Sequence, residues 1–274
     1  MEGRIIARGV LAGALGGLLA FVFARIFAEP VISRAIDYES ARDEAKASVM
    51  HMHMEDGPDI FSRTIQANIG IGVGIIAVGC AMGALFAVVY CVAAPHVARM
   101  EPRRLALAIA ASMFVGVYLL PYLKYPANPP AIGNPDTIKE RGGLYLLMVA
   151  ISVALVWIAW IAGLTLAPRI GAWYATVAGG AVAVVGWGVA ALLLPTFGSL
   201  AGNPPGSVTE TPKPLTDSAG HVLFAGFDAD DLFSFRLYSV GAQVILWLVI
   251  GLAGGELISR LAERSRARAL APSV

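Results

Sequence analysis

Long apolar runs, separated by polar segments, follow one another along most of the chain. A helix needs about 20 consecutive apolar residues to cross the hydrocarbon core of a bilayer, and six runs are close to that length or exceed it. The strands of a transmembrane β-barrel would instead alternate apolar and polar residues over about ten positions. We therefore predict an all-α polytopic membrane protein, a six-transmembrane-helix bundle that forms a single membrane domain over residues 1–274. The predicted helices are approximately 5–28, 67–94, 105–122, 144–166, 172–194 and 236–258.

Composition agrees with this class. Hydrophobic residues make up 57% of the chain and charged residues 14%, with a mean hydropathy of +0.71. Soluble domains usually hold about 45–50% apolar and about 25% charged residues. The net charge of +1 does not indicate a nucleic-acid partner, and we expect none. Membrane lipid is the partner that this composition predicts.

The polar segments predict how the chain is oriented in the membrane. Residues 29–66, 123–143 and 195–235 lie on one side of the six-helix topology and carry most of the acidic residues. The opposite side is much shorter but rich in arginine, and positive residues in short loops tend to remain in the cytoplasm. We therefore expect a bacterial plasma-membrane protein with both termini cytoplasmic and the three long segments outside. Pro121 and Pro195 are expected to end the third and fifth helices beside these outer segments.

Small residues recur within the apolar runs at a spacing that favours close helix packing. GxxxG units let two helix backbones approach each other in lipid, and we expect them to pack helices within one bundle. They are formed by Gly9, Gly13 and Gly17, by Gly79 and Gly83, and by Gly251 and Gly255. Cys80 and Cys91 lie in one predicted helix about three turns apart, which excludes a disulfide between them.

The chain contains no linear motif of an enzyme. A phosphate-binding loop, a GxSxG nucleophile turn and an HExxH zinc motif are all absent from the sequence. We therefore expect no enzymatic activity and no permanently bound cofactor, with any metal ion being cargo.

The sequence MHMHMED at residues 50–56 is the strongest candidate metal site. In an extended backbone alternate side chains share a face, so His51 and His53 would point the same way. With the acids that follow, they suit cobalt, nickel or zinc, whereas the methionine face suits Cu(I). In a helix, Met50, His53 and Met54 would group instead. The candidate ligands are Met50, His51, Met52, His53, Met54, Glu55 and Asp56.

Other polar residues are candidates for an ion path. Asn68 and Gln243 are uncharged oxygen donors within apolar runs, where they either line a cation path or hydrogen-bond neighbouring helices. The cluster of Asp228, Asp230 and Asp231 either concentrates cations at the outer surface or marks the start of a helix, where acids are favoured.

The chain resembles one known family along its whole length, and three stretches carry the resemblance. A Gly/Ala-rich first helix closes on Glu29-Pro30, and a proline-rich stretch, YPANPPAIGNPDTIKERGGLYLL, spans residues 125–147. The third stretch is FDADDLFSFRLYSVGAQVILW, residues 227–247. With these features the chain resembles the CbtA family of predicted cobalt transporter subunits.

The resemblance implies a membrane subunit that imports Co²⁺ together with a small single-helix companion subunit that carries histidines. It points to His51 and His53, and to the turns at Asn128–Pro130 and Asn134–Asp136, as candidate functional residues. Asn128, Asn134 and Asp136 are thereby candidates for an ion path or a vestibule. The methionine-rich segment leaves nickel and copper as alternative metals, and a non-transporting scaffold or accessory subunit is the alternative of a different class. A homo-oligomer also remains open.

Overall fold

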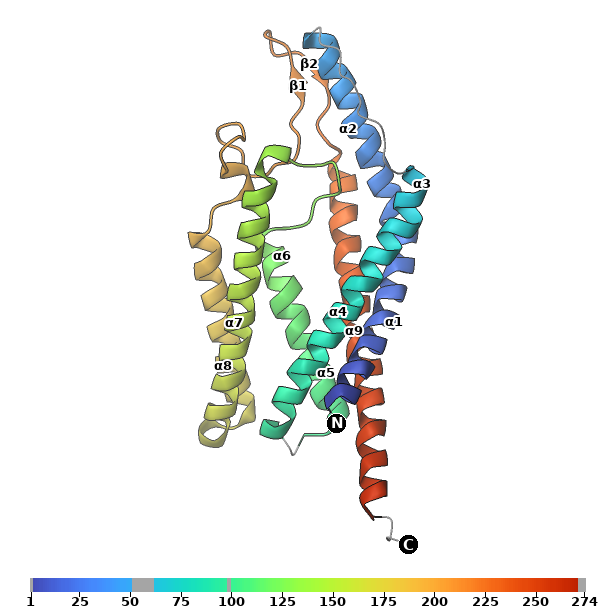
Figure 1. Ribbon diagram of the computed structural model, residues 1–274. Helices are drawn as coiled ribbons and strands as arrows, with labels where there is room; N and C mark the ends of the chain where they lie inside the picture. The colour runs from blue at the N-terminus through green and yellow to red at the C-terminus, as the bar shows by residue number, and fades with distance from the viewer. Residues whose placement is uncertain (1, 51–61, 98–99, 271–274) are drawn as a thin grey trace. The chain divides into compact units, whose positions relative to one another are not determined.

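The computed structural model describes residues 2–50, 62–97 and 100–270 (Figure 1). Within these residues, six helical segments are long and apolar enough to cross a membrane. Backbone polar groups in hydrocarbon must be satisfied within the protein, and continuous helices achieve this segment by segment. The prediction of an all-α polytopic membrane protein with six spanning helices is therefore confirmed. The spans are Glu2–Phe27, Arg63–Val97, Pro102–Lys124, Pro135–Ile170, Ala172–Ser199 and Ala229–Glu263.

The described residues divide into two compact units. The first unit contains residues 2–26, 62–114 and 240–270, and the second contains residues 27–50 and 115–239.

In the first unit, α1 (Glu2–Phe27) and α4 (Ile71–Ala93) touch backbone to backbone. A Cβ atom placed on Gly13 would fall on the carbonyl oxygen of Gly79, and one placed on Gly83 would fall on that of Gly9. Only residues without a side chain permit such an approach. The GxxxG units of these helices therefore pack helices within one unit, as the sequence predicts.

The same unit contains α5 (Pro102–Met113) and the part of α9 (Ala229–Leu270) that begins at Val240. Gly251 and Gly255 of α9 face Ala110 and Ala106 of α5. Its remaining elements are α3 (Arg63–Ile65), the π-helix η1 (Gln66–Gly70) and the 3₁₀-helix η2 (Ala94–Val97). Cys80 and Cys91 are free thiols in α4, in agreement with the sequence.

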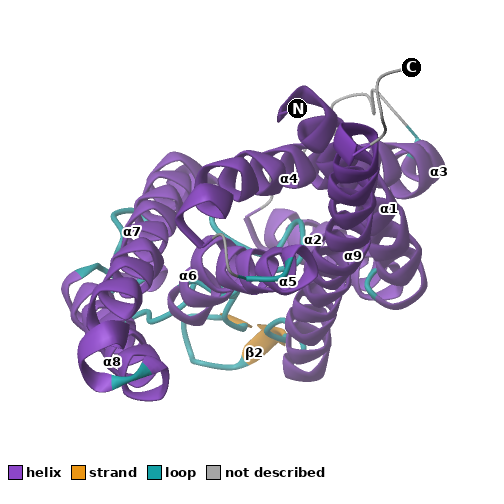
Figure 2. Ribbon diagram, turned by 90° about the horizontal axis from the view of Figure 1, so that it is seen from below, coloured by secondary structure: helices purple, strands orange, loops and turns teal. Residues whose placement is uncertain are grey.

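The second unit is built around an antiparallel pair of helices. The helices α7 (Ile138–Ile170) and α8 (Ala172–Leu193) lie side by side in both views (Figures 1 and 2). They are joined at Gly171, whose φ of 84° is a conformation that suits glycine. Trp187 of α8 donates a hydrogen bond from Nε1 to the carbonyl of Leu120, 2.8 Å away. This bond ties α8 to α6 (Leu120–Lys124).

Pro121 does not end the third spanning helix, contrary to the prediction. It is the second residue of α6, which continues to Lys124. The segment before it, η3 (Phe114–Leu119), is a π-helix. Proline lacks an N–H group and its ring collides with the carbonyl four residues earlier in a regular α-helix, so a local change of hydrogen-bond register accommodates it. Pro195 does follow the end of α8, as expected.

The polar segments hold structure that the sequence analysis did not predict. Residues 29–50 form one helix, α2 (Glu29–Met50), which begins two residues after α1 ends. Antiparallel strands β1 (Leu215–Thr216) and β2 (Val222–Phe224) form a hairpin beside α2 (Figure 1). Two 3₁₀-helices, η4 (Pro135–Thr137) and η5 (Phe197–Ser199), lie in the other polar segments.

Candidate functional site

The MHMHMED segment lies almost wholly outside the described residues. Met50 is the last residue of α2, and the next described residue is Ser62. The candidate ligands at residues 50–56 therefore stay predictions. Among the residues that the structure does describe, no group of three or more His, Cys, Asp or Glu side chains is placed to hold a metal ion.

The helix that leads into this segment is anchored by contacts in its first half. Arg34 Nε donates to Asp231 Oδ2 at 2.9 Å and pairs with the same carboxylate through Nη2. This hydrogen bond raises the pKa of Arg34 above its usual value. The Tyr38 hydroxyl donates to the carbonyl of Ala225 at 3.0 Å, and its ring packs edge-on against Phe227, 5.2 Å between centroids. These contacts fix α2 against the start of α9 and the segment before it.

The aspartates at the start of α9 have local structural roles. Asp228 Oδ1 accepts hydrogen bonds from the backbone N–H groups of Asp230 and Asp231, each at 2.9 Å. This is the geometry of a helix N-cap, which satisfies donors that the first turn leaves free. Asp230 is exposed, and Asp231 pairs with Arg34. The helix-start interpretation therefore accounts for Asp228, whereas the Asp231 carboxylate binds Arg34 of α2.

The candidate Asn128 binds an arginine of α9. Arg236 Nη2 donates to Asn128 Oδ1 at 2.9 Å, and its Nε donates to the carbonyl of Ala127 at 3.2 Å. The Tyr122 hydroxyl donates to the carbonyl of Arg236 at 3.1 Å. The first family turn is thus held by a partly buried guanidinium, which occupies the amide oxygen that was expected to face a cation.

The second family turn is held by hydrogen bonds of Asn134. Its Oδ1 accepts from the backbone N–H of Asp136 at 3.0 Å, which caps η4. Its Nδ2 donates to the carbonyl of Gly202 at 3.0 Å and to Asn203 Oδ1 at 2.9 Å. Asp136 itself is exposed. Asn134 therefore links the segment before α7 to the segment after α8.

Glu210 is the centre of this network, and it is not among the residues predicted from the sequence. The residue is only 8% exposed. Its Oε1 accepts from Thr137 Oγ1 at 2.5 Å and from Asn203 Nδ2 at 2.9 Å. Arg141 Nε lies 2.9 Å from the other carboxylate oxygen and forms an ion pair with it. The sequence did hold a signal for the turns around it. Asn134 and Asn203 each precede a proline, which restricts the backbone of the preceding residue to an extended or turn conformation.

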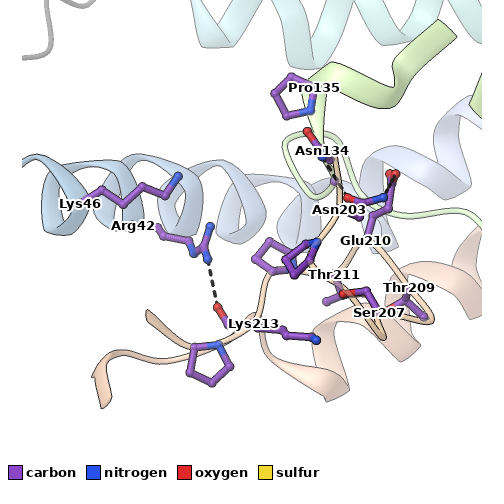
Figure 3. A pocket seen from close by; sticks show the side chains of 14 residues that line it. Arg42, Lys46, Asn134, Pro135, Asn203, Ser207, Thr209, Glu210, Thr211 and Lys213 are labelled. Carbon is purple, nitrogen blue, oxygen red and sulfur yellow. Dashed lines mark hydrogen bonds between the residues drawn. The ribbon is translucent and has the colours of Figure 1, made fainter. Parts of the chain in front are cut away.

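A pocket opens beside this network, with a volume of about 470 Å³ (Figure 3). Arg42 and Lys46 extend into it from α2, and the opposite wall is formed by the turn at residues 133–135 and the segment 203–214. Arg42 Nη2 donates to the carbonyl of Lys213 at 3.0 Å across this space. The pocket lies wholly within the second unit.

The remaining candidates lie apart from this network. Asn68 Oδ1 accepts from Arg25 Nε at 2.9 Å, and its Nδ2 donates to the carbonyl of Thr64 at 2.8 Å. Gln243 is half-buried in α9. Asn68 thus hydrogen-bonds a neighbouring helix, which was one of its two interpretations.

Two histidines outside the MHMHMED segment also have local partners. His96 Nδ1 lies 2.9 Å from the carbonyl of Val92, one turn earlier. His221 Nδ1 lies 3.0 Å from Asp217 Oδ2 in the β1–β2 turn. Hydrogen bonds, first from the His221 backbone and then from its side chain, lower the pKa of Asp217.

Comparison with known proteins places these features in a family. A family model described as "Probable cobalt transporter subunit (CbtA)" matches residues 2–259. Comparisons with curated proteins and with solved structures gave no match. The matched range covers five of the spanning segments completely and the sixth as far as residue 259, and it includes both turns that belong to the proline-rich stretch. The chain therefore belongs to the CbtA family, whose members are described as subunits of a probable cobalt transporter.

Proposed function

We propose that this chain is the plasma-membrane subunit through which Co²⁺ enters the cytoplasm. The observation that carries the proposal is the family match over residues 2–259 of a chain with six spanning helices. In this proposal both termini are cytoplasmic, and a small single-helix companion subunit contributes further histidines. The three long polar segments lie outside, where the ion arrives.

Capture at MHMHMED is supported by the position of this segment. It begins at the last residue of α2, and Arg34 and Tyr38 hold α2 in place within the second unit. The two histidines therefore follow directly on a helix that is held at Arg34 and Tyr38. An extended backbone would present His51 and His53 together, which suits a borderline divalent ion and leaves coordination positions open for release.

Import of a divalent cation needs no ATP-hydrolysing module. A charge of 2+ that moves into a negative cytoplasm gains about 4.6 kcal/mol per 100 mV of membrane potential. The energetic difficulty is instead removal of the hydration shell within the membrane. Oxygen atoms of interrupted helices can replace water there, and the π-helical segment η3 before Pro121 is such an interruption.

Uptake of labelled metal tests this proposal. Cells with the protein should accumulate more cobalt than cells without it, and the double variant His51→Ala/His53→Ala should lose most of the difference at low external cobalt. The matched control is His96→Ala/His221→Ala, which removes the other two histidines and should leave uptake unchanged.

The outcomes separate the parts of the proposal. Equal accumulation of cobalt, nickel and copper with and without the protein would contradict transport and favour an accessory subunit. Preferential uptake of nickel or copper would change the proposed cargo metal but leave the transport function in place. Normal cobalt uptake by the His51/His53 variant would contradict capture at this segment but not transport.

A further inference from the structure

We propose that the pocket between α2 and the segment 203–214 binds a small organic anion that carries two or more carboxylate groups. This binding site is independent of the ion that the chain transports. It follows from the charges, the unmatched donors and the size of the pocket.

The charges that line the pocket are mainly positive. Arg42, Lys46 and Lys213 all line it, and Glu210 is the one acid among its described lining residues. The Glu210 carboxylate is already compensated by its ion pair with Arg141, which is not part of the lining. Lys46 lies 2.7 Å from Asp43, one turn earlier on α2, so its charge is partly balanced. Arg42 and Lys213 have no such acidic partner in the described structure. A cation would be repelled here, and an anion attracted.

Two buried donor groups in the wall have no hydrogen-bond partner within the described residues. They are the guanidinium and hydroxyl donors Arg42 Nε and Thr211 Oγ1. A third atom of the lining, Glu210 Oε2, also lacks a hydrogen bond, but it forms the ion pair with Arg141. The Arg42 guanidinium is held in place through Nη2, which donates to the carbonyl of Lys213. Its Nε makes no hydrogen bond among the described residues, and the Tyr38 hydroxyl, one turn earlier on α2, is the side chain that interacts with this guanidinium. Buried donors in native proteins nearly always find an acceptor, and a bound carboxylate would supply one to both atoms.

The size and the remaining surface of the pocket favour an organic molecule over a simple inorganic ion. Sites for small molecules commonly measure about 300–1,000 Å³, and this pocket measures about 470 Å³. Four prolines contribute to its walls and offer apolar surface to a carbon skeleton. Because proline fixes its own φ angle, these walls lose little conformational freedom when a ligand binds. The prolines are Pro135, Pro204, Pro212 and Pro214.

Titration calorimetry on the purified full chain in nanodiscs of zwitterionic lipid tests the site. Citrate is the probe, inorganic phosphate tests the need for a carbon skeleton, and glycerol tests the need for charge. We expect citrate to bind, to bind more tightly than phosphate, and to weaken as salt is added. Glycerol should show no binding.

Three variants test the proposed contacts. Thr211→Val keeps the side-chain shape, removes the unmatched hydroxyl, and should weaken citrate binding about tenfold. Lys46→Gln and Lys213→Gln each remove a lining charge and should weaken it several-fold. Lys139→Gln is the matched control, since this lysine is exposed on α7 and does not line the pocket. Its affinity for citrate should not change.

Several results would overturn the proposal. Absence of citrate binding at millimolar concentration would do so, as would equal affinities of Lys213→Gln and Lys139→Gln. Phosphate binding as tight as citrate binding would contradict the organic skeleton. If Thr211→Val raises the melting temperature and leaves citrate affinity unchanged, its hydroxyl is merely an unpaired group and not a ligand contact.

Discussion

Single side chains connect polar segments that are far apart in the sequence. Asn134 donates a hydrogen bond to Asn203, and Asn203 in turn donates one to Glu210. Glu210 is the member whose change should matter most, because its side chain is only 1% exposed and a buried carboxylate needs compensation. Arg141 provides that compensation from the start of α7.

The substitution Glu210→Gln should lower the local stability of residues 197–214. The change keeps an oxygen that can accept from Thr137 and Asn203 but removes the charge that Arg141 pairs with. Breaking a buried pair costs about 3–5 kcal/mol, and the 23% exposure of the Arg141 side chain lowers our expectation to about 1–3 kcal/mol. Hydrogen exchange of the backbone at residues 197–214 should become correspondingly faster.

The control for this substitution is Asp136→Asn, which neutralises an exposed acid in the neighbouring turn. Its exchange rates should match those of the unmodified protein. Equal rates in Glu210→Gln and Asp136→Asn would contradict the structural role that we assign to the buried carboxylate.

At the scale of helices and strands, length and apolar content made the spanning helices predictable, because lipid leaves a long apolar segment few alternatives to a helix. The helix α2 is different, since it is polar and its packing surface is narrow. Val31, Ala35 and Tyr38 follow a helical spacing, and Ala35 packs against Ile132 and Phe227. This stripe was the available signal, but its partners lie so far along the chain that the sequence does not reveal them.

The backbone contact of α1 with α4 predicts that two glycines of α4 differ in how much their replacement by alanine changes the stability of the protein. Gly83→Ala should destabilise the protein, because the added methyl group would fall on the carbonyl oxygen of Gly9. Overpacking of this kind commonly costs about 1–3 kcal/mol. Gly74→Ala is the matched control, since nothing lies within 4 Å of its added methyl group.

Unfolding of the two purified variants in detergent provides the measurement. Gly74→Ala should unfold at the same denaturant concentration as the unmodified protein or a higher one, because alanine favours the helix by up to about 1 kcal/mol. If Gly83→Ala were equally stable, the close approach of the two helices would be wrong.

At the scale of the whole molecule, the arginine-rich short segments predict the orientation of the chain in the membrane. Cysteine labelling in intact cells checks this directly, in a background where Cys80→Ala and Cys91→Ala remove the native thiols. Ser218→Cys, in the exposed β1–β2 turn, should react with a membrane-impermeant maleimide from outside. Arg104→Cys, where the native side chain is 81% exposed, should react only after the membrane is permeabilised. The reverse pattern would place MHMHMED on the cytoplasmic side and make it an exit site.

The class of protein could thus be predicted from sequence, and so could its family, whereas the pocket could not. Arg42, Asn134 and Thr211 come from three separate segments, and no short motif contains them together. Arg42 and Asn134 are held by hydrogen bonds to residues more than 60 positions away in the sequence. The MHMHMED segment was recognisable for the opposite reason, since its chemistry is contained in seven consecutive residues.

The length of α7 has a consequence for where the pocket lies. Its 33 residues extend about 50 Å, whereas the hydrocarbon core of a bilayer is about 30 Å thick. Tilt takes up part of this excess, and the polar first turns, which carry Arg141, extend into the headgroup layer. Anionic headgroups create a negative surface potential that enriches cations and depletes anions within about 10 Å. The lipid charge would therefore act on the two proposed ligands in opposite directions, raising the local concentration of Co²⁺ while lowering that of a carboxylate.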